Sequence, residues 1–479
     1  MATATLTTVD LGQAPIDRFR TLLDQGAWSE LESTMGRLSA VLRGRVLWNV
    51  NSTAQGGGVA ELLGSLIPYE RGAGIDERWV VIAGSPPFFA VTKRLHNMLH
   101  GSLTDDLEIS AEERRVYDET MERNAALLVE IVRPGDPIII HDPQAAGLVP
   151  LLARHGAHVI WRSHVGVDAP NDSTRAAWNM LRPYLGAASA LVFSRSTYVW
   201  DGLDRSRVHV IAPAIDPFSV KNQELDEKAV GAVLAAAGIV QGPRGEALLR
   251  RADGGAVRVT HAAEVCGGGV PPCARLVVQV SRWDGLKDPV GVMQGFAEHV
   301  APIAESRLVL AGPSAGSVRD DPEQPEVLRQ AIATREQMAP QVRESIHIAQ
   351  LPTDDVDENA AIVNALQRRA GVVVQKSLAE GFGLTVAEAM WKGRPIVASR
   401  VGGIEDQIEN GKNGLLIDDP SDLRAFGDAA VRLLNDRAEA DRLGHEAHRR
   451  AIRQFLAPRH LVEQARLVMR VLQPNSQPV

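Results

Sequence analysis

Cysteine, long apolar runs and signal-like segments are all scarce in this chain of 479 residues. The two cysteines, Cys266 and Cys273, are too few for a disulfide framework, and with His261 nearby they still fall short of a closed zinc site. No uncharged apolar stretch reaches the eighteen or so residues of a membrane span, and the first twenty residues lack the basic start and apolar run of a secretory signal. These absences predict a cytoplasmic protein with no metal site and no membrane partner.

Positive charge is also in short supply. The sequence has 51 Lys and Arg against 59 Asp and Glu, a net charge of −8, and no basic run carries interleaved aromatic residues. Such runs are typical of nucleic-acid binding, so a nucleic-acid partner is not expected. A hydrophobic fraction of 45% and a charged fraction of 23% are typical of a soluble globular protein. The length predicts two domains of roughly 200 residues each.

Short apolar runs rich in Val and Ile alternate with longer helical stretches along the whole chain. Near-continuous apolar runs of this kind indicate parallel strands that helices cover on both faces. The sequence therefore predicts an α/β protein with two doubly wound, Rossmann-like sheets. The runs lie at 45–50, 79–83, 137–141, 158–161, 190–193 and 208–211, and then at 275–280, 307–311, 345–349, 371–374, 395–398 and 414–417.

The domain boundary is expected near residue 215, where Pro213 and Pro217 follow the end of a strand. This divides the chain into domains at 1–215 and 216–457. Residues 238–272, rich in glycine and arginine, predict an irregular insertion or surface loop. The last apolar helical pattern, 458–472, is expected to pack back on the first domain.

The segment 375–390 is the most informative part of the sequence. A buried strand ends near Val374, a turn with Gly381 and Gly383 follows, and a helix begins near Leu384. In an open α/β sheet this is the edge where ligands bind, and the helix N-terminus favours a phosphate. Glu380 and Glu388 flank the turn, so we expect two carboxylates to face one cleft and to bind sugar hydroxyls.

A second strand-to-helix junction, at 280–289, carries Arg282 and Lys287. A guanidinium and an ammonium in this position suit a diphosphate. Gly312 ends another strand, and the turn 51–61, which contains Gly57, follows the first strand and opens a helix. These glycine turns are either parts of the ligand site or purely structural turns.

Polar residues also follow two strands of the first half. Asp142 and Gln144 come directly after one strand, and Arg162, His164 and Asp168 follow the next. The motifs are H-D-P-Q, which begins at His141, and W-R-S-H-x-x-x-D. The residues of these motifs are the best candidates for binding an acceptor. A lone histidine such as His141 is, however, also common as a purely structural residue.

These motifs resemble those of retaining glycosyltransferases with the two-domain GT-B fold, the family that includes sucrose synthases and many bacterial glucosyl- and mannosyltransferases. Glu380 and Glu388 match its E-x7-E signature. Within the family, the first-half motifs are similar to those of nucleotide-sugar-dependent trehalose synthases and of trehalose phosphorylases. The resemblance spans most of the chain, except about 225–272.

The resemblance implies roles for individual residues. It implies that Arg282 and Lys287 neutralise the donor diphosphate, that Glu380 holds the donor sugar, and that Glu388 binds the ribose. The implied catalytic residues are Arg282, Lys287, Glu380, His164 and Asp142. The implied donor-binding residues are Glu388, Gly381, Phe382, Gly383, Leu384, Thr385, Gly312 and Gly57. The implied acceptor-binding residues are Gln144, Arg162 and Asp168.

The implied reaction is glucosyl transfer from a nucleoside-diphosphate-glucose (UDP-, ADP- or GDP-glucose) to free glucose, giving α,α-trehalose with retention of configuration. It requires no obligatory cofactor and no metal ion, and the resemblance alone implies a homodimer. Three alternatives stay open: a retaining trehalose phosphorylase, glucosyl transfer to another small polar acceptor, and a sugar-nucleotide-binding regulator without turnover.

Overall fold

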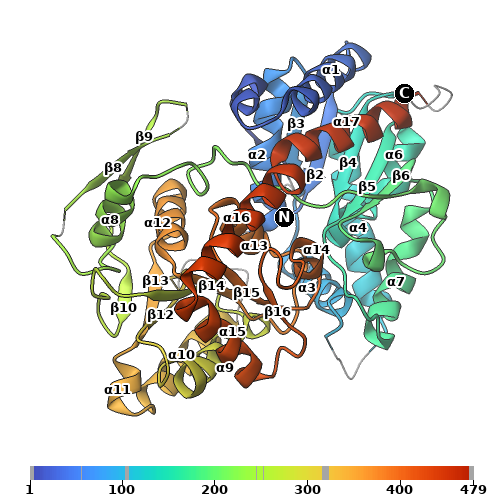
Figure 1. Ribbon diagram of the computed structural model, residues 1–479. Helices are drawn as coiled ribbons and strands as arrows, with labels where there is room; N and C mark the ends of the chain where they lie inside the picture. The colour runs from blue at the N-terminus through green and yellow to red at the C-terminus, as the bar shows by residue number, and fades with distance from the viewer. Residues whose placement is uncertain are drawn as a thin grey trace. The chain divides into compact units, whose positions relative to one another are not determined.

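The computed structural model describes residues 5–54, 57–102, 107–243, 245–251, 253–314 and 323–473. The chain forms two compact units, Met1–Ala214 together with Ala457–Val479, and Ile215–Leu456 (Figure 1). The chain leaves the first unit after Ala214 and returns to it at Ala457, so the last helix belongs to the first unit. None of the helices in the described ranges combines the length and the apolar character needed to cross a bilayer.

The first unit is built on a seven-stranded sheet in the order β1-β3-β2-β4-β5-β6-β7. All neighbouring strands are parallel except β1, which pairs antiparallel with β3 at the edge. The strands are β1 (Thr7–Val9), β2 (Leu47–Asn51), β3 (Glu77–Val81), β4 (Pro137–His141), β5 (His158–Ser163), β6 (Ala190–Phe193) and β7 (Val208–Val210). The helices are η1 (Ile16–Thr21), α1 (Gln25–Val41), α2 (Gly58–Gly72), α3 (Pro86–Leu99), α4 (Ala111–Leu128), α5 (Asp142–Ala145), α6 (Leu148–His155), α7 (Asp172–Leu185), η2 (Ser196–Tyr198), η3 (Arg205–Arg207) and α17 (Ala457–Leu472).

Helices cover both faces of this sheet. Successive side chains of a strand point to opposite faces, and on β3 Val80 lies in the large core cluster while Trp79 and Val81 lie in a second, smaller one. Every residue of β2 and β4 is buried. Both faces are therefore closed to solvent, which explains the near-continuous apolar runs in the sequence.

The second unit repeats this plan with the order β10-β13-β12-β11-β14-β15-β16, again with an antiparallel edge strand, β10, beside β13. Its strands are β8 (Ala247–Arg250), β9 (Ala256–Val259), β10 (Glu264–Cys266), β11 (Leu276–Val280), β12 (Arg307–Pro313), β13 (Ile346–Leu351), β14 (Val372–Gln375), β15 (Ile396–Ser399) and β16 (Leu415–Ile417). Its helices are α8 (Glu227–Ala236), η4 (Gly285–Lys287), α9 (Pro289–Gly295), η5 (Phe296–Val300), α10 (Gln324–Glu336), α11 (Pro340–Arg343), α12 (Val356–Arg369), α13 (Leu384–Trp391), α14 (Gly403–Gln407), α15 (Leu423–Asn435) and α16 (Arg437–Gln454).

Each apolar run that the sequence singles out overlaps a strand, and the predicted pair of doubly wound sheets is confirmed. The prediction for residues 238–272 was wrong in part. This segment contains the β8–β9 hairpin and the edge strand β10. The hairpin buries Leu249 and Val257 and is held to α12 by Glu358, which accepts hydrogen bonds from the Thr260 and His261 N–H groups at 2.5 and 2.7 Å. Strands of three or four residues separated by glycines carry too short a pattern to be seen in the sequence.

Helix α17 is joined to the first unit by buried polar contacts as well as by packing on α1 and α2. The His460 ring is completely buried, and its Nδ1 donates to the Ala212 carbonyl at 3.0 Å. Its Nε2 then accepts from Arg162 Nη1 at 2.9 Å. Arg162 is itself only 2% exposed, so the helix supplies a hydrogen-bond partner to a charge inside the core.

We predict that His460→Ala lowers the free energy of unfolding by about 2 to 3 kcal/mol, because it leaves the buried guanidinium of Arg162 without one acceptor. Arg466→Ala is the matched control. Arg466 lies on the same helix and pairs with Glu30 at 2.6 Å, but both side chains are 47% exposed, so about 1 kcal/mol or less is expected. Denaturant unfolding of the two variants measures the difference, and equal losses would contradict the assigned role of His460.

Candidate active site

The loop between β14 and α13 holds the carboxylate that the sequence places at the ligand-binding edge of the second sheet. Gly383, the N-cap of α13, has φ 83° and ψ 61°, a left-handed conformation that glycine adopts without strain. The loop backbone is fixed from α14, because Gln407 Nε2 donates to the Phe382 carbonyl at 2.5 Å. The Gly403 N–H also donates to the Gly381 carbonyl at 2.9 Å. The first N–H groups of α13 therefore follow a rigid turn.

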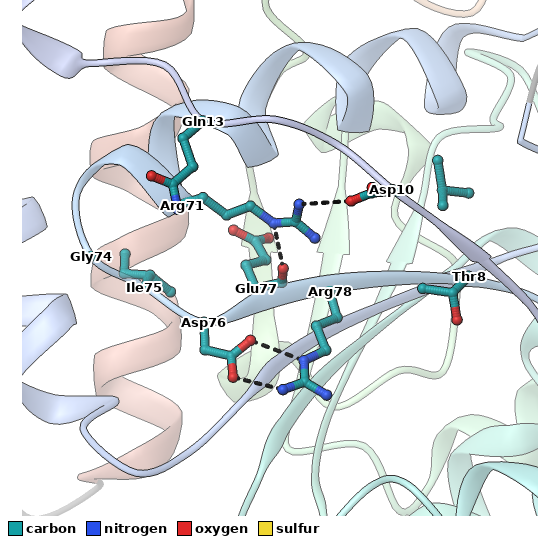
Figure 2. A pocket seen from close by; sticks show the side chains of 10 residues that line it. Thr8, Asp10, Gln13, Arg71, Gly74, Ile75, Asp76, Glu77 and Arg78 are labelled. Carbon is teal, nitrogen blue, oxygen red and sulfur yellow. Dashed lines mark hydrogen bonds and ion pairs between the residues drawn. The ribbon is translucent and has the colours of Figure 1, made fainter.

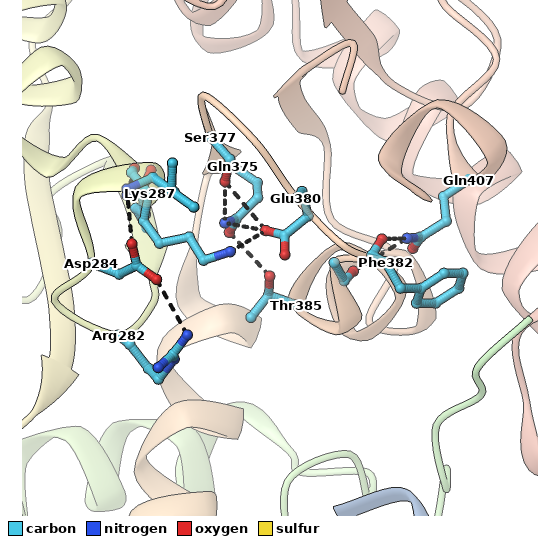
Figure 3. Close-up of polar contacts among 12 residues, drawn as sticks. Arg282, Asp284, Lys287, Gln375, Ser377, Glu380, Phe382, Thr385 and Gln407 are labelled. Atoms are coloured by element: carbon cyan, nitrogen blue, oxygen red, sulfur yellow. Dashed lines mark hydrogen bonds and ion pairs between the residues drawn. The ribbon is translucent and has the colours of Figure 1, made fainter. Parts of the chain in front are cut away.

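Glu380 sits in this loop with its side chain 11% exposed (Figure 3). One carboxylate oxygen, Oε2, forms an ion pair of 2.6 Å with Lys287 Nζ. The same oxygen lies 3.3 Å from Ser377 Oγ and 3.4 Å from Gln375 Nε2. Gln375 in turn accepts from Thr385 Oγ1 at 3.0 Å. The predicted sugar-binding and diphosphate-binding residues, Glu380 and Lys287, are thus direct neighbours.

Arg282 and Lys287 lie in the loop between β11 and α9. Arg282 contacts Asp284 at 3.2 Å and its side chain is 49% exposed, whereas that of Lys287 is 15% exposed. The loop between β11 and α9 is joined to the loop between β14 and α13 by Lys376, a fully buried lysine that pairs with Asp288. Asp288 has φ 49°, which is unusual for a residue other than glycine, and its carboxylate also caps α9. Two loops far apart in the sequence are therefore held together by ion pairs.

Glu388 lies deeper than the sequence suggests. Its side chain is completely buried, Oε1 pairs with Lys221 Nζ at 2.7 Å, and Gln367 Nε2 lies 3.3 Å from Oε2. The expectation that both carboxylates face one open cleft is corrected accordingly. Leu384 is the first residue of α13 and Glu388 the fifth, and α13 is buried on most of its circumference from Val386 onward. Lys221, the ion-pair partner of Glu388, has a side chain that is 23% exposed.

Packing accounts for the positions of two predicted donor-site residues, Gly312 and Phe382. A side chain at Gly312 would approach the Ser281 carbonyl to 2.6 Å and the ring of Trp283 to 2.7 Å. Phe382 packs edge-on against Phe455, with ring centroids 6.0 Å apart.

In the first unit, the predicted residues His141, Asp142 and His164 are brought together at the carboxyl ends of β4 and β5. His141 Nδ1 lies 3.0 Å from His164 Nε2, and the rings are stacked with centroids 5.3 Å apart. Asp142 has φ 64° and accepts from the His164 backbone N–H at 2.7 Å. His141 is 1% exposed, whereas His164 and Asp142 are only partly buried. His164 is therefore the member of the histidine pair that is accessible at the edge of the sheet.

The remaining predicted residues of the first unit differ in their contacts; they are Gln144, Asp168, Arg162 and Gly57. Gln144 is partly buried, and its Oε1 has no hydrogen-bond partner among the described residues. Asp168 pairs with Arg195 and accepts from Thr197 Oγ1 at 3.0 Å. Arg162 is directed toward α17, where it donates to His460. Its position therefore gives no support to contact with an acceptor. Gly57 caps α2 with an extended backbone and open space around it, while Gln55 and Gly56 lie outside the described residues.

Burial controls protonation in the first unit. Burial lowers the pKa of His141 to about 3, with the charge of Arg162 as a second cause. Burial, followed by Arg162 and His141, also holds the pKa of His164 well below its usual range. Burial raises the pKa of Asp142 to about 7, against the opposing effects of the His164 N–H and of Arg162. Both histidines are therefore neutral near pH 7, and Asp142 titrates there.

An open hollow of about 460 Å³ lies away from these residues, beside β1 and β3 (Figure 2). Its polar side chains bond mainly to one another: Asp76 pairs with Arg78 at 2.8 Å, and Arg71 Nε donates to the Glu77 carbonyl at 2.8 Å. None of the predicted site residues lines it. The described residues also contain no cluster of three or more His, Cys, Asp or Glu that could hold a metal ion.

Sequence reasoning missed several side chains that shape both sites. In the second unit they are Lys221, Asp288, Gln375, Lys376, Ser377 and Gln407. In the first unit they are Asn49 and Glu77, which lie behind the histidine pair. No local motif marks these residues, because each acts through a partner that is distant in the sequence. A polar residue within or at the end of a mostly apolar strand, as at Asn49, Glu77 and Gln375, is the signal that could have found three of them.

Comparisons with known proteins identify the family of this chain. Residues 49–200 match the family described as trehalose synthase, N-terminal domain, and residues 274–450 match glycosyl transferases group 1. A trehalose synthase from Rubrobacter xylanophilus is 34% identical over 472 residues, covering 97% of this chain and 99% of that protein. This chain belongs to the trehalose synthase family.

More distant similarities extend to a trehalose phosphorylase and to a solved structure. A trehalose phosphorylase from Pleurotus sajor-caju is 28% identical over 392 residues, which cover 76% of this chain and 50% of that protein. The structure of α,α-trehalose 6-phosphate synthase from Burkholderia multivorans matches with a TM-score of 0.66 at 17% identity, covering 90% of this chain and 100% of that chain. The protein is a glycosyltransferase with the GT-B fold.

The raised pKa of Asp142 predicts a pH-dependent stability effect. Its ordinary pKa is near 3.8, and its folded value is about 7. Between these values the unfolded chain loses the proton and the folded protein keeps it, so this carboxyl destabilises the fold increasingly as pH rises from about 4 to 7. Asp142→Asn removes this effect and keeps an oxygen that can accept from the His164 N–H. The stability of the variant relative to the original should therefore increase from pH 4 to 7 and then level off.

Denaturant unfolding at five or six pH values, followed by tryptophan fluorescence, measures this difference. Asp168→Asn, on a carboxylate that is 39% exposed, is the control. A stability difference between Asp142→Asn and the original protein that is constant with pH would contradict the burial of an uncharged Asp142.

Proposed function

We propose that this protein is a retaining glucosyltransferase that moves glucose from a nucleoside-diphosphate-glucose to free glucose and forms α,α-trehalose. The observation that carries this proposal is the Lys287–Glu380 ion pair of 2.6 Å at the N-terminus of α13. It places a cation for phosphate and a carboxylate for sugar hydroxyls side by side. The similarity to trehalose synthases over nearly the whole chain supports the choice of product.

The donor side follows from charge. The diphosphate lies near Lys287 and Arg282, whose charges stabilise the departing nucleotide, and the N–H groups at the start of α13 add a favourable dipole. Glu380 accepts hydrogen bonds from hydroxyls of the donor glucose. The family resemblance assigns the ribose hydroxyls to Glu388, which is buried beside Lys221. Because these groups are already held by Ser377, Gln375 and Lys376, little reorganisation is needed when charge develops on the leaving group.

The acceptor side is formed by His164, Asp142 and Gln144. They offer a ring nitrogen, a carboxyl and an unpartnered amide oxygen to a small polyhydroxy acceptor. In the reaction the anomeric hydroxyl oxygen of the acceptor bonds to C1 of the donor glucose on the face that the diphosphate leaves. The C1–O bond to the diphosphate breaks, and the acceptor proton passes to the departing phosphate oxygen. Configuration at C1 is retained without a covalent enzyme intermediate.

The test incubates the purified protein and free glucose with UDP-, ADP- or GDP-glucose, and separately with glucose 1-phosphate. NMR identifies the disaccharide and its anomeric linkage. An α,α-1,1 product from a nucleotide sugar supports the proposal and identifies the base. Product from glucose 1-phosphate alone would make the protein a trehalose phosphorylase, and the absence of any disaccharide would favour another acceptor or a binding protein. Sedimentation of the same sample tests the expected homodimer.

We predict that Lys287→Ala lowers kcat about 100- to 1000-fold, the range for removing one preorganised group that stabilises transition-state charge. Arg282→Ala should act in the same direction. Lys412→Ala is the control, because Lys412 lies in the same unit, is 65% exposed and pairs only with the nearby Glu409. Steady-state kinetics at saturating donor measure kcat. A Lys287→Ala loss no larger than that of Lys412→Ala would contradict the role of Lys287.

The ribose role of Glu388 predicts a selective effect on the donor. Glu388→Gln should raise the donor KM about ten- to one-hundred-fold, the cost of losing charged hydrogen bonds to hydroxyls. The KM of a donor that lacks the ribose 2′- and 3′-hydroxyls should be similar in variant and original. If Glu388→Gln weakens both donors equally, Glu388 acts only by holding Lys221 and α13.

A further inference from the structure

A chain of buried side chains crosses the first sheet and ends at the histidine pair. It starts at Glu77 on β3, continues through Asn49 on β2 and His141 on β4, and ends at His164 after β5. Asn49 Nδ2 lies 2.6 Å from Glu77 Oε1, and Asn49 Oδ1 lies 3.0 Å from His141 Nε2. His141 Nδ1 then lies 3.0 Å from His164 Nε2. Glu77, Asn49 and His141 are at most 1% exposed.

The chain begins at a pair of buried carboxyl groups. Glu70 on α2 lies beside Glu77, burial raises the pKa of both carboxyls, and Gln464 of α17 donates to Glu70 at 3.1 Å. Glu77 Oε2 has no hydrogen-bond partner among the described residues, so it is the oxygen that can carry the proton of this carboxyl. Glu77 Oε1 is left to accept from Asn49.

These partners determine the direction of every hydrogen bond in the chain. Since Glu77 Oε1 accepts, Asn49 presents its NH2 group to Glu77 and its Oδ1 to His141. His141 must then carry its proton on Nε2 and offer a lone pair at Nδ1. His164 donates to that lone pair from Nε2, and its own Nδ1 is left without a proton. The orientation of one amide thus determines the tautomers of two neutral histidines.

We propose that Asn49 and Glu77 are positioning residues that fix the tautomer of His164, so that its unprotonated Nδ1 accepts a hydrogen bond from a hydroxyl of the acceptor sugar. This inference rests on the proposed function for the contact between His164 and the acceptor. It goes beyond that function in naming the residues that decide whether His164 donates or accepts. A buried polar chain is costly unless every member is paired, and this one leads to the partly exposed ring that the acceptor is proposed to meet.

The experiment combines histidine 15N NMR with kinetics of the full chain. In the original protein, His164 should show a lone-pair-type 15N shift at Nδ1 and a protonated-type shift at Nε2, with the assignment made from His164→Gln. In Asn49→Leu, the Nε2–H of His141 loses its acceptor, so His141 should move its proton to Nδ1 and His164 should gain a proton on its own Nδ1. Glu77→Gln is the milder variant, since its amide allows Asn49 both orientations.

The kinetic expectation is specific to the acceptor. Asn49→Leu should raise the KM of acceptor glucose about ten-fold, the loss of one hydrogen bond, and leave the donor KM unchanged. A glucose analogue that carries fluorine in place of the hydroxyl bonded to His164 should bind the original protein more weakly than glucose does. Asn49→Leu should bind the analogue and glucose equally. Asn124→Leu is the matched control, because Asn124 is an equally buried asparagine of the same unit that bonds only to the main chain at Thr120 and Ala83.

The outcomes separate the inference from the proposed function. Unchanged histidine tautomers in both Asn49→Leu and Glu77→Gln would overturn the inference, as would the same acceptor KM increase in Asn124→Leu. A changed tautomer with an unchanged acceptor KM would overturn the link between the chain and the acceptor. The NMR experiment needs no substrate, so failure of the proposed glucosyl transfer would be recognised separately, by the absence of product in the original protein.

Discussion

Burial of both faces of each parallel sheet decides where this protein can place a polar side chain. Helices close the faces, so strand residues are either apolar or paired inside the core. The carboxyl edge is the remaining place where strand ends, glycine turns and helix N-termini can meet a ligand. Both units use this edge, and the candidate residues Glu380, Lys287, Asp142 and His164 all lie on it.

The first unit makes an unusual use of one sheet face. The sheet face covered by α2 and α17 carries the side chains of Asn49, Glu77, His141 and Arg162. On those two helices, Glu70, His460 and Gln464 lie beside them. These contacts join the last helix of the chain to the same network that ends at His164. Stability and site geometry are therefore coupled in this unit, because the groups that hold α17 also surround the histidine pair.

The second unit organises its site with ion pairs instead. Lys287 joins Glu380, Lys376 joins Asp288, and Lys221 joins Glu388, so each of these three carboxylates is matched by a lysine from a different part of the chain. Two of these pairs involve side chains that are completely buried, Lys376 and Glu388. Breaking either would leave an uncompensated charge in the core. Such pairs fix the two loops before a substrate arrives.

The sequence by itself determined the fold class and the places where chemistry can occur, because apolar runs and glycine turns are local patterns that follow from burial of parallel strands. It also marked Glu380, Lys287, His164 and Asp142, which stand next to those patterns. Only the tertiary structure showed that Glu388 is buried beside Lys221, that Arg162 donates to His460 of α17, and that Asn49 and Glu77 stand behind the histidines. Those facts depend on contacts between residues from 28 to almost 300 positions apart, and no local spacing encodes which distant partner a polar side chain will meet.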